Sequence, residues 1–308
     1  MKTLADFINE WLVKYKRNSV KASTYDRLET AFDQFTKYPI ANIPIEGLTT
    51  DILQDYVNCL VNDGYALTTI KKQFHLLTGF IEYANLRGLI QRPIHKGVRL
   101  PTESVVKKHR KSVVAYSDAE QKKLLDILER GDSDAFYAVI LMMETGMRAG
   151  EVLALSWDDI DFKRRSIRVS KTMIRLSNNR TGYNFIQHEA KSFSSNRIIP
   201  LSTRAYSLLE LHRLNADQNN EAVFKSTRGD YLTYESLRFW TKKACDEAKV
   251  PYYGQHVFRH TFATNCYNRG CDVKLLSKLL GHADVTITYN VYIHLFGDAL
   301  EELRTVIG

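Results

Sequence analysis

The chain has 308 residues, 44% of them hydrophobic, which allows one large or two ordinary globular domains. Its formal net charge is +8. Residues 1–112 contain 17 Lys and Arg against 11 Asp and Glu, and the remainder contains 26 against 24. On charge alone, binding to a polyanion such as nucleic acid and a merely basic, soluble surface are about equally favoured interpretations. No run of about 18 apolar residues indicates a membrane span, and the four cysteines form no C-x-x-C pair; this argues against membrane, disulfide-framework and zinc-site classes and for a reduced, cytoplasmic protein.

The first hundred residues carry apolar side chains at the i, i+3, i+4 spacing of amphipathic helices. The stripes lie within residues 4–15, 25–35, 52–60 and 68–86, and Thr49 or Thr50 is a suitable N-cap for the third. These patterns predict a small, all-helical domain over residues 1–104.

A basic segment follows, with a run from Lys107 to Lys111 and little helical pattern. Such a run is usually only solvated, but between two domains of a basic protein it could also follow a phosphate backbone. We therefore assign residues 105–112 to a linker. Ser117 and Glu120 form a capping box, which predicts the first helix of a second domain over residues 113–308.

The second domain begins with helical, strongly apolar sequence up to Met143, which Thr145 and Gly146 interrupt before a short helix over 149–155. Strand-like segments follow at 165–172, 183–190 and 197–201, and helices resume at about Thr203, Thr233 and His256. The predicted fold class is therefore mainly α, with a small antiparallel β-sheet in the C-terminal domain.

The helix over 256–270 gathers His256, Arg259 and His260 on one face. An arginine fork with neighbouring imidazoles is suited to phosphate oxygens, although a surface salt bridge is the ordinary alternative. A metal pair is less favoured, because no Glu separates the two histidines as in H-E-x-x-H. Metal binding is therefore not predicted here.

Three further candidates are each unremarkable in isolation. Arg148 stands at the start of a short helix, where backbone amides also favour anions; Lys191 lies in a turn; and His282 follows Gly281 at the end of a helix that Asp272 can cap. The segment 285–292 has the composition of a strand, which would place Tyr289 and Tyr292 on opposite faces, whereas a helix would bring them to the same side. The residues alone leave that choice open.

In this order and spacing, the motifs resemble the tyrosine recombinase (phage integrase) family. The matching blocks are Thr145–Glu151, Lys191 ahead of Arg197–Leu201, His256–His260, Leu280–His282 and Tyr292–His294. The resemblance covers the whole second domain, and the first domain resembles more loosely the helical, SAM-like core-binding domain of the same family. It implies a mainly α catalytic domain that needs neither cofactor nor metal.

The resemblance also implies a role for each matched residue. Arg148 and Arg259 would clamp the scissile phosphate, with a hydrogen bond added by His282. Lys191 would protonate the departing 5′-oxygen, His256 would assist proton transfer, and Tyr292 would attack phosphorus to give a 3′-phosphotyrosyl enzyme. The family's nucleophile lies nine or ten residues beyond the histidine that follows glycine, which selects Tyr292, ten beyond His282, over Tyr289, seven beyond it. The same resemblance favours a helix over 285–292.

The partners implied are a double-stranded DNA recombination site and further copies of the chain, assembled as a tetramer on DNA through a tail helix over about 297–308. An excisionase or a host DNA-bending protein is a further candidate partner, and no membrane is expected. The expected function is strand exchange for integration or excision of a mobile element, or for resolution of DNA molecules. Two alternatives remain: a type IB topoisomerase, and a DNA-binding regulator with a silent active site. Six filled catalytic positions argue against the regulator, and the two-domain layout with its tail favours recombination.

Overall fold

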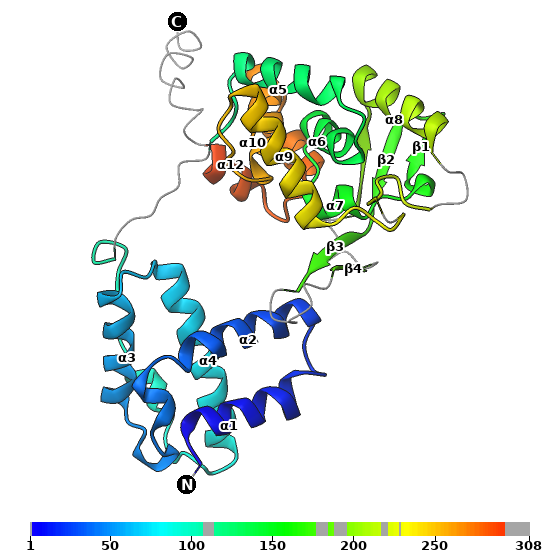
Figure 1. Ribbon diagram of the computed structural model, residues 1–308. Coiled ribbons are helices and arrows are strands. Elements are labelled where there is room, and N and C mark those ends of the chain that lie inside the picture. The colour runs from blue at the N-terminus through cyan, green and yellow to red at the C-terminus, as the bar shows by residue number, and fades with distance from the viewer. Residues whose placement is uncertain are drawn as a thin grey trace, which may run out of the picture. The chain divides into compact units, whose positions relative to one another are not determined.

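The computed structural model describes residues 2–106, 114–176, 184–187, 196–216, 221–227 and 229–292. These residues divide into two compact units (Figure 1). The first contains residues 2–106 together with Arg175 and Leu176, and the second contains the other described residues from Val114 onward. Among the described helices, none combines the length and apolar character needed to cross a membrane.

The first unit is helical, as the apolar stripes predict. Its α-helices are α1 (Leu4–Trp11), α2 (Ala22–Phe35), α3 (Thr50–Asn62) and α4 (Leu67–Leu86). A π-helical turn (Leu12–Lys16) continues α1, and 3₁₀ turns cover Pro39–Asn42, Ile45–Gly47 and Ile94–Gly97. Thr49 is the N-cap of α3, because its hydroxyl accepts the N–H of Ile52. The core of this unit forms where α4 packs against α2 and α3.

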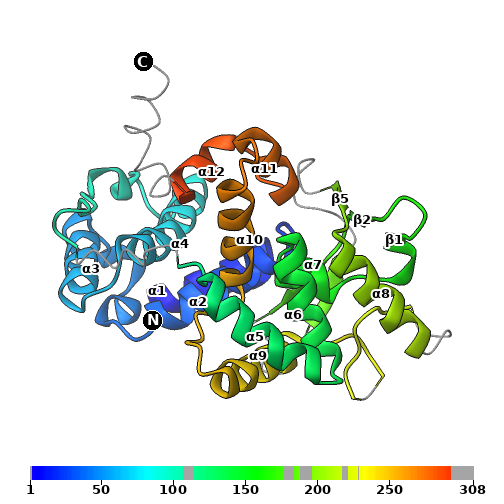
Figure 2. The same cartoon turned by 90° about the horizontal axis from the view of Figure 1, so that it is seen from above.

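Eight α-helices are described in the second unit: α5 (Asp118–Arg130), α6 (Asp134–Thr145), α7 (Ala149–Leu153), α8 (Thr203–Asn215), α9 (Tyr234–Ala248), α10 (His256–Asn268), α11 (Val273–Leu280) and α12 (Val285–Tyr292). The expected capping box of Ser117 and Glu120 opens α5. Helix α6 is central and almost wholly buried, because α5, α8, α9 and α10 all pack against it (Figure 2). It therefore provides a rigid support for the residues that follow its C-terminus.

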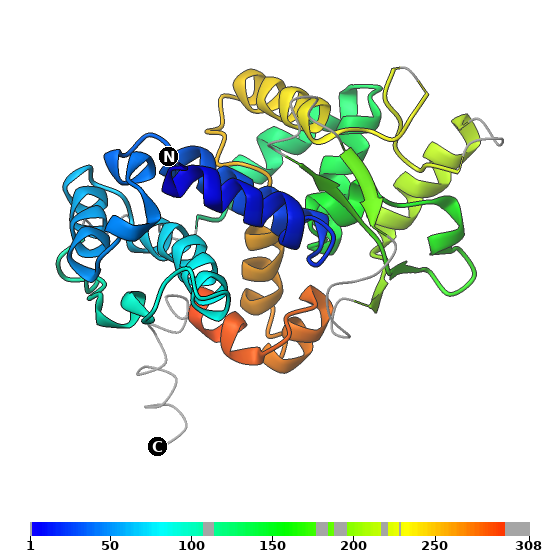
Figure 3. The ribbon, with the colours of Figure 1, turned by 90° about the horizontal axis from the view of Figure 1, so that it is seen from below.

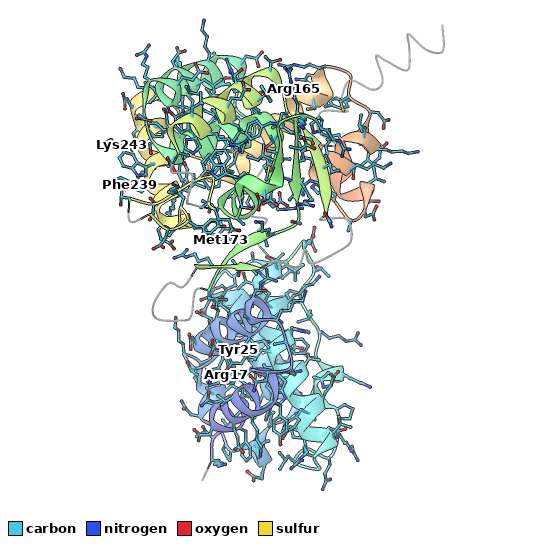
Figure 4. The ribbon with its side chains drawn as sticks, turned by 90° about the vertical axis from the view of Figure 1, so that its right-hand side faces the viewer. Arg17, Tyr25, Arg165, Met173, Phe239 and Lys243 are labelled. Atoms are coloured by element: carbon cyan, nitrogen blue, oxygen red, sulfur yellow. The ribbon has the colours of Figure 1, made fainter. Side chains whose placement is uncertain are left out.

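The strands of the second unit form two small sheets. Strands β1 (Ile160–Asp161), β2 (Ser166–Val169) and β5 (Arg197–Pro200) pair in the order β1-β2-β5, antiparallel, while β3 (Thr172–Arg175) pairs with β4 (Asn184–Gln187). Arg165 occupies the turn before β2 and places its guanidinium over the Tyr206 ring, and Met173 lies on β3 (Figure 4). The small antiparallel sheet is confirmed, but the expected strand over 165–172 is divided between β2 and β3.

Strand β5 presents alternate residues to the interior of the domain. Arg197 and Ile199 are buried, whereas Ile198 is exposed. The register sets Val169 of β2 opposite Arg197 and Ile167 opposite Ile199. Arg197 thus lies on the inward-facing side of β5, where core side chains are expected. A buried arginine requires polar partners inside the domain.

Helices α10, α11 and α12 follow one another through two tight connections (orange in Figure 3). The N–H of Cys271 bonds the carbonyl of Cys266, and Asp272 caps α11 through the N–H groups of Lys274 and Leu275. Gly281 ends α11 in the left-handed region at φ 67°, as its place in the sequence predicts. Residues 285–292 form a helix, so the strand that propensity favours there is wrong and the helix that the resemblance favours is confirmed.

Candidate active site

Arg148 lies at the N-cap of α7, directly after the turn that ends α6. Its backbone N–H bonds Glu151 Oε2 at 2.8 Å, and its Nη1 bonds Glu151 Oε1 at 2.8 Å. Its Nη2 donates to the carbonyl of Gly281 at 3.3 Å. The side chain of Arg148 remains 35% exposed. The guanidinium is thus anchored from one side and accessible to solvent from the other.

Glu151 is the anchor of this arrangement. Its side chain is only 5% exposed, and both of its oxygens also receive hydrogen bonds from Arg197, Nη1 to Oε1 at 3.0 Å and Nη2 to Oε2 at 2.8 Å. Burial by itself would raise the pKa of this carboxyl, but the hydrogen bonds and charge of Arg197, then those of Arg148, lower the pKa of Glu151 to about 2. Glu151 is therefore a carboxylate throughout the neutral range.

Arg259, the second arginine of the predicted clamp, is buried within α10. Its Nη1 donates to the carbonyl of Gly146 at 2.9 Å, and its Nη2 donates to the carbonyl of Leu280 at 2.6 Å. Gly146 is left-handed, at φ 64°, and a Cβ there would approach the Phe262 ring to 2.4 Å. The glycine therefore allows α10 to pack against the turn that leads into Arg148.

Three arginines thus converge on one helix end. The carbonyls of Leu279, Leu280 and Gly281 accept hydrogen bonds from Arg197 (Nε, 2.6 Å), Arg259 and Arg148, in that order. The last carbonyls of a helix have no partner within the helix and carry partial negative charge, so they are suited to cationic donors. Arg148, Glu151, Arg197 and Arg259 are called the arginine cluster below.

The arginine cluster has three positive charges and one negative charge at neutral pH. Its excess of two positive charges lies in a largely desolvated region, where an anion is bound more strongly than at the surface. A singly charged phosphodiester would offset part of that excess. Among the residues that the structure describes, no group of three or more His, Cys, Asp or Glu side chains is arranged to hold a metal ion.

The two histidines beside the arginine cluster are held in the neutral form. Burial, then the charges of Arg259 and Arg148, lower the pKa of His256 and lower that of His282 to about 4. His282 Nδ1 lies 2.7 Å from the hydroxyl of Thr288, a buried residue of α12. When the hydroxyl donates to Nδ1, the imidazole proton lies on Nε2, where it can serve as a hydrogen-bond donor.

The structure brings together four of the six residues that the sequence nominates. These four are Arg148, Arg259, His256 and His282. The two arginines bind neighbouring carbonyls at the end of α11, and their charges lower the pKa of both histidines. Lys191 lies outside the described residues. Tyr292 is the last residue of α12, but its side chain is outside the described set.

Two contributors were not assigned a role from sequence. Arg197 was noted only as the start of a matching motif, yet it binds both oxygens of Glu151. A signal for it existed, because its strand alternates and places Arg197 on the same face as Ile199, so the arginine faces inward. Thr288, which bonds His282, carried no such signal, because its contact depends on where α12 lies.

One described lysine next to β3 has other partners. Lys171 Nζ bonds the hydroxyl of Ser156 at 2.5 Å and the carboxylate of Asp159 at 3.0 Å, and its side chain is 11% exposed. This ammonium is held by the 3₁₀ turn Trp157–Asp159 and its N-cap Ser156, which precede β1. It is therefore a suitable comparison for Lys191 in mutagenesis.

Comparison with known proteins finds two family matches within the chain. Residues 116–298 match the phage integrase family, and residues 3–61 match the N-terminal SAM-like domain of phage integrases. A tyrosine recombinase XerC-like protein of Caldanaerobacter subterraneus subsp. tengcongensis is 30% identical, with 95% of this chain and 79% of the relative covered. An integrase of transposon Tn1549, solved with transposon right-end DNA, has a TM-score of 0.81 at 21% identity and full coverage of both chains. A lambda integrase tetramer on a Holliday junction has a TM-score of 0.67 at 18% identity, covering 94% of this chain and 77% of the other.

The neutral state of His282 can be tested by titration. Because burial and the arginine charges lower its pKa to about 4, its ring resonances should titrate well below the ordinary value of about 6.5. Replacing Arg148 with Ala removes one of those charges and should raise the midpoint. The measurement is the pH dependence of the imidazole ¹H–¹³C signals, assigned with a His282→Asn variant. A midpoint near 6.5 in the unmodified protein would contradict the assignment.

The same shift affects stability. A histidine whose pKa is lower in the folded than in the unfolded state makes unfolding easier as the pH falls from about 6.5 toward 4, because the unfolded chain takes up the proton first. The free energy of unfolding should therefore fall less steeply over that window in His282→Asn than in the unmodified protein. The free energy of unfolding is measured by urea denaturation at several pH values, and an equal dependence on pH in the two proteins would contradict this.

Proposed function

The chain belongs to the phage integrase family, and we propose that it is a site-specific recombinase that cleaves and rejoins DNA strands through a 3′-phosphotyrosyl intermediate. It is a tyrosine-type recombinase by family. The observation that carries the proposal is the arginine cluster at the end of α11, which has excess positive charge, is open to solvent at Arg148 and lies beside two neutral imidazoles. A phosphodiester is the anion that such a cluster fits best.

Tyr292 is the proposed nucleophile. Thr288 faces His282, and position 292 lies one helical turn beyond Thr288, on the same face of α12. Position 289 lies about a quarter turn beyond Thr288, and the Tyr289 side chain is 42% exposed. The register of α12 therefore supports Tyr292 over Tyr289 independently of the spacing from His282.

The proposed reaction has two balanced steps. In cleavage, the Tyr292 oxygen attacks phosphorus, its phenolic proton passes to the neutral His256, and the bond from phosphorus to the 5′-oxygen breaks as Lys191 donates a proton to that oxygen. In rejoining, a 5′-hydroxyl attacks the phosphotyrosine and the protons return. Because the phosphotyrosyl bond retains the energy of the phosphodiester, strand exchange requires no nucleotide hydrolysis.

Electrostatics explains why the arginines are needed. A phenol has a pKa of about 10 and an anionic phosphodiester repels a phenolate, so the nucleophile requires cationic surroundings. Arg148 and Arg259 offset the charge that develops on the non-bridging oxygens, and His282 adds a donor through Nε2. These donors are fixed before DNA arrives, which lowers the cost of reorganisation during the reaction.

The partners proposed are a double-stranded DNA recombination site and further copies of this chain. We propose that the tail over residues 297–308 docks on a neighbouring copy and so couples assembly of a tetramer on DNA to placement of Tyr292. Leu275 of α11 and Tyr289 of α12 are exposed and could accept an apolar tail. An excisionase or a host DNA-bending protein would determine the direction of recombination and is not needed for the chemistry.

Substitution of the nucleophile tests the function directly. When the protein is incubated with DNA that flanks its gene, covalent junctions between protein and DNA should form and can be mapped by sequencing. Tyr292→Phe should abolish these adducts while binding persists, because it removes only the attacking oxygen. Tyr289→Phe is the matched control and should retain adducts. Adducts that persist in Tyr292→Phe would refute the assignment, and relaxation of supercoiled DNA without recombinant products would favour a topoisomerase.

Lys191 can be tested through the leaving group. With a 5′-bridging sulfur at the mapped junction, the leaving thiolate needs no proton donor, since a thiol has a pKa of about 8.5. Lys191→Ala should slow cleavage of the ordinary phosphodiester by about a hundredfold and that of the sulfur substrate by less than about fivefold. Lys171→Ala should show no such selective recovery. Recovery confined to Lys171→Ala would transfer the role to Lys171.

Removal of the tail tests the assembly proposal. Deleting residues 297–308 should weaken formation of the complex that contains two DNA sites by about tenfold or more, a loss of effective concentration. Binding to a single site should remain within about twofold of the full chain. Gel-shift titrations with one-site and two-site duplexes measure both, and equal losses in the two would contradict the docking role.

A further inference from the structure

We propose that Arg197 is a positioning residue for strand exchange, which holds Glu151 and the carboxyl end of α11 so that Arg148 can present its guanidinium to the scissile phosphate. The proposal deepens the function proposed above and rests on it. It assigns to β5 a part in the active site, although Arg197 itself contacts no reacting atom.

Arg197 is bonded in two directions at once. Its side chain is 6% exposed; Nη1 and Nη2 bind the two oxygens of Glu151 at 3.0 and 2.8 Å, and Nε binds the carbonyl of Leu279 at 2.6 Å. The first direction leads to the residue that anchors Arg148. The second leads to the helix end whose next two carbonyls bond Arg259 and Arg148.

The bonds to Glu151 determine what Arg148 can do. Arginine and carboxylate pair most strongly through two parallel hydrogen bonds. If Arg197 did not bind both oxygens, Glu151 would be a buried carboxylate with Arg148 as its main remaining cationic partner among the cluster. Arg148 would then turn both Nη groups toward Glu151 and away from the phosphate. With Arg197 in place, the side chain of Arg148 makes only one hydrogen bond to Glu151, through Nη1.

The chemistry of this position requires arginine in particular. The planar fork satisfies two carboxylate oxygens while Nε reaches a third acceptor, whereas a lysine ammonium is a compact charge that cannot hold all three in one plane. A buried ion pair is weak evidence for stability, because apolar residues of similar volume often serve a fold as well. The presence of the pair beside Arg148 is therefore better explained by the geometry that it gives to the site.

The test uses two substrates that differ in charge. The full chain is assayed on nicked duplexes built on the mapped junction, one with the ordinary phosphodiester and one with an uncharged methylphosphonate at the scissile position. The neutral substrate has no anionic oxygen in the ground state, and only one non-bridging oxygen gains charge during the reaction, so the orientation of Arg148 should matter much less. Single-turnover cleavage rates and duplex affinity are measured for each variant.

Arg197→Lys should cut the rate on the phosphodiester by about a hundredfold, the scale expected of a small misplacement at a reacting centre. Its rate on the methylphosphonate should fall by less than about fivefold, and duplex affinity should stay within about twofold. Arg148→Ala should show the same selectivity. Arg168→Ala is the matched control, because Arg168 is an exposed arginine on the adjacent strand β2 and should leave both rates unchanged.

A second variant protects the test against misfolding. Glu151→Gln weakens the same Arg197–Glu151 interaction by changing the carboxylate, with little change in side-chain shape. It should reproduce the selectivity of Arg197→Lys. The result counts for each variant that unfolds cooperatively and is therefore folded. In such a variant, an equal loss of cleavage rate on both substrates, or no loss on either, would overturn the positioning role. If the unmodified chain forms no adduct at all, the proposed function fails instead, so the two failures are distinguishable.

Discussion

The active site depends on the C-terminal end of one helix, whose last carbonyls need hydrogen-bond donors from outside the helix. Helix α11 terminates at Gly281 in a left-handed turn, which leaves the carbonyls of Leu279, Leu280 and Gly281 without partners inside the helix. Three arginines supply the donors, one from β5, one from α10 and one from the start of α7. Segments from distant parts of the chain are thereby brought to one point, and the histidine that follows Gly281 is placed beside them.

This arrangement sets the charge state of the neighbouring groups. Glu151 offsets one of three positive charges and stays ionised, while burial, aided by the remaining positive charge, lowers the pKa of His256 and His282 and keeps both neutral. A neutral imidazole can accept a hydrogen bond or a proton at one nitrogen and donate a hydrogen bond from the other, whereas both nitrogens of an imidazolium are donors. The excess charge that attracts a phosphate therefore adds to the effect of burial in keeping both imidazoles neutral.

Sequence predicts those parts of the structure that have local causes. The capping box at Ser117, the stop at Gly281 and the amphipathic stripes of the first unit depend on neighbours a few positions away, and the structure confirms them. The clamp arginines were recognisable through an ordered motif. The partners of Arg197 were not, because a pleat indicates that a side chain faces inward but not what it meets there. The division of the expected strand into β2 and β3 also depends on pairing with distant segments.

Helix α12 shows how a side-chain contact and packing against α11 can override propensity. Its sequence is rich in β-branched and aromatic residues that favour strands. An extended chain from His282 to Thr288 would span about 20 Å, at roughly 3.3 Å per residue. The 2.7 Å contact between His282 Nδ1 and the Thr288 hydroxyl is incompatible with that length, and a turn followed by a helix satisfies it. Once Thr288 is fixed against His282, helical register determines the position of residue 292. A contact that orients an imidazole therefore also places the backbone of the proposed nucleophile.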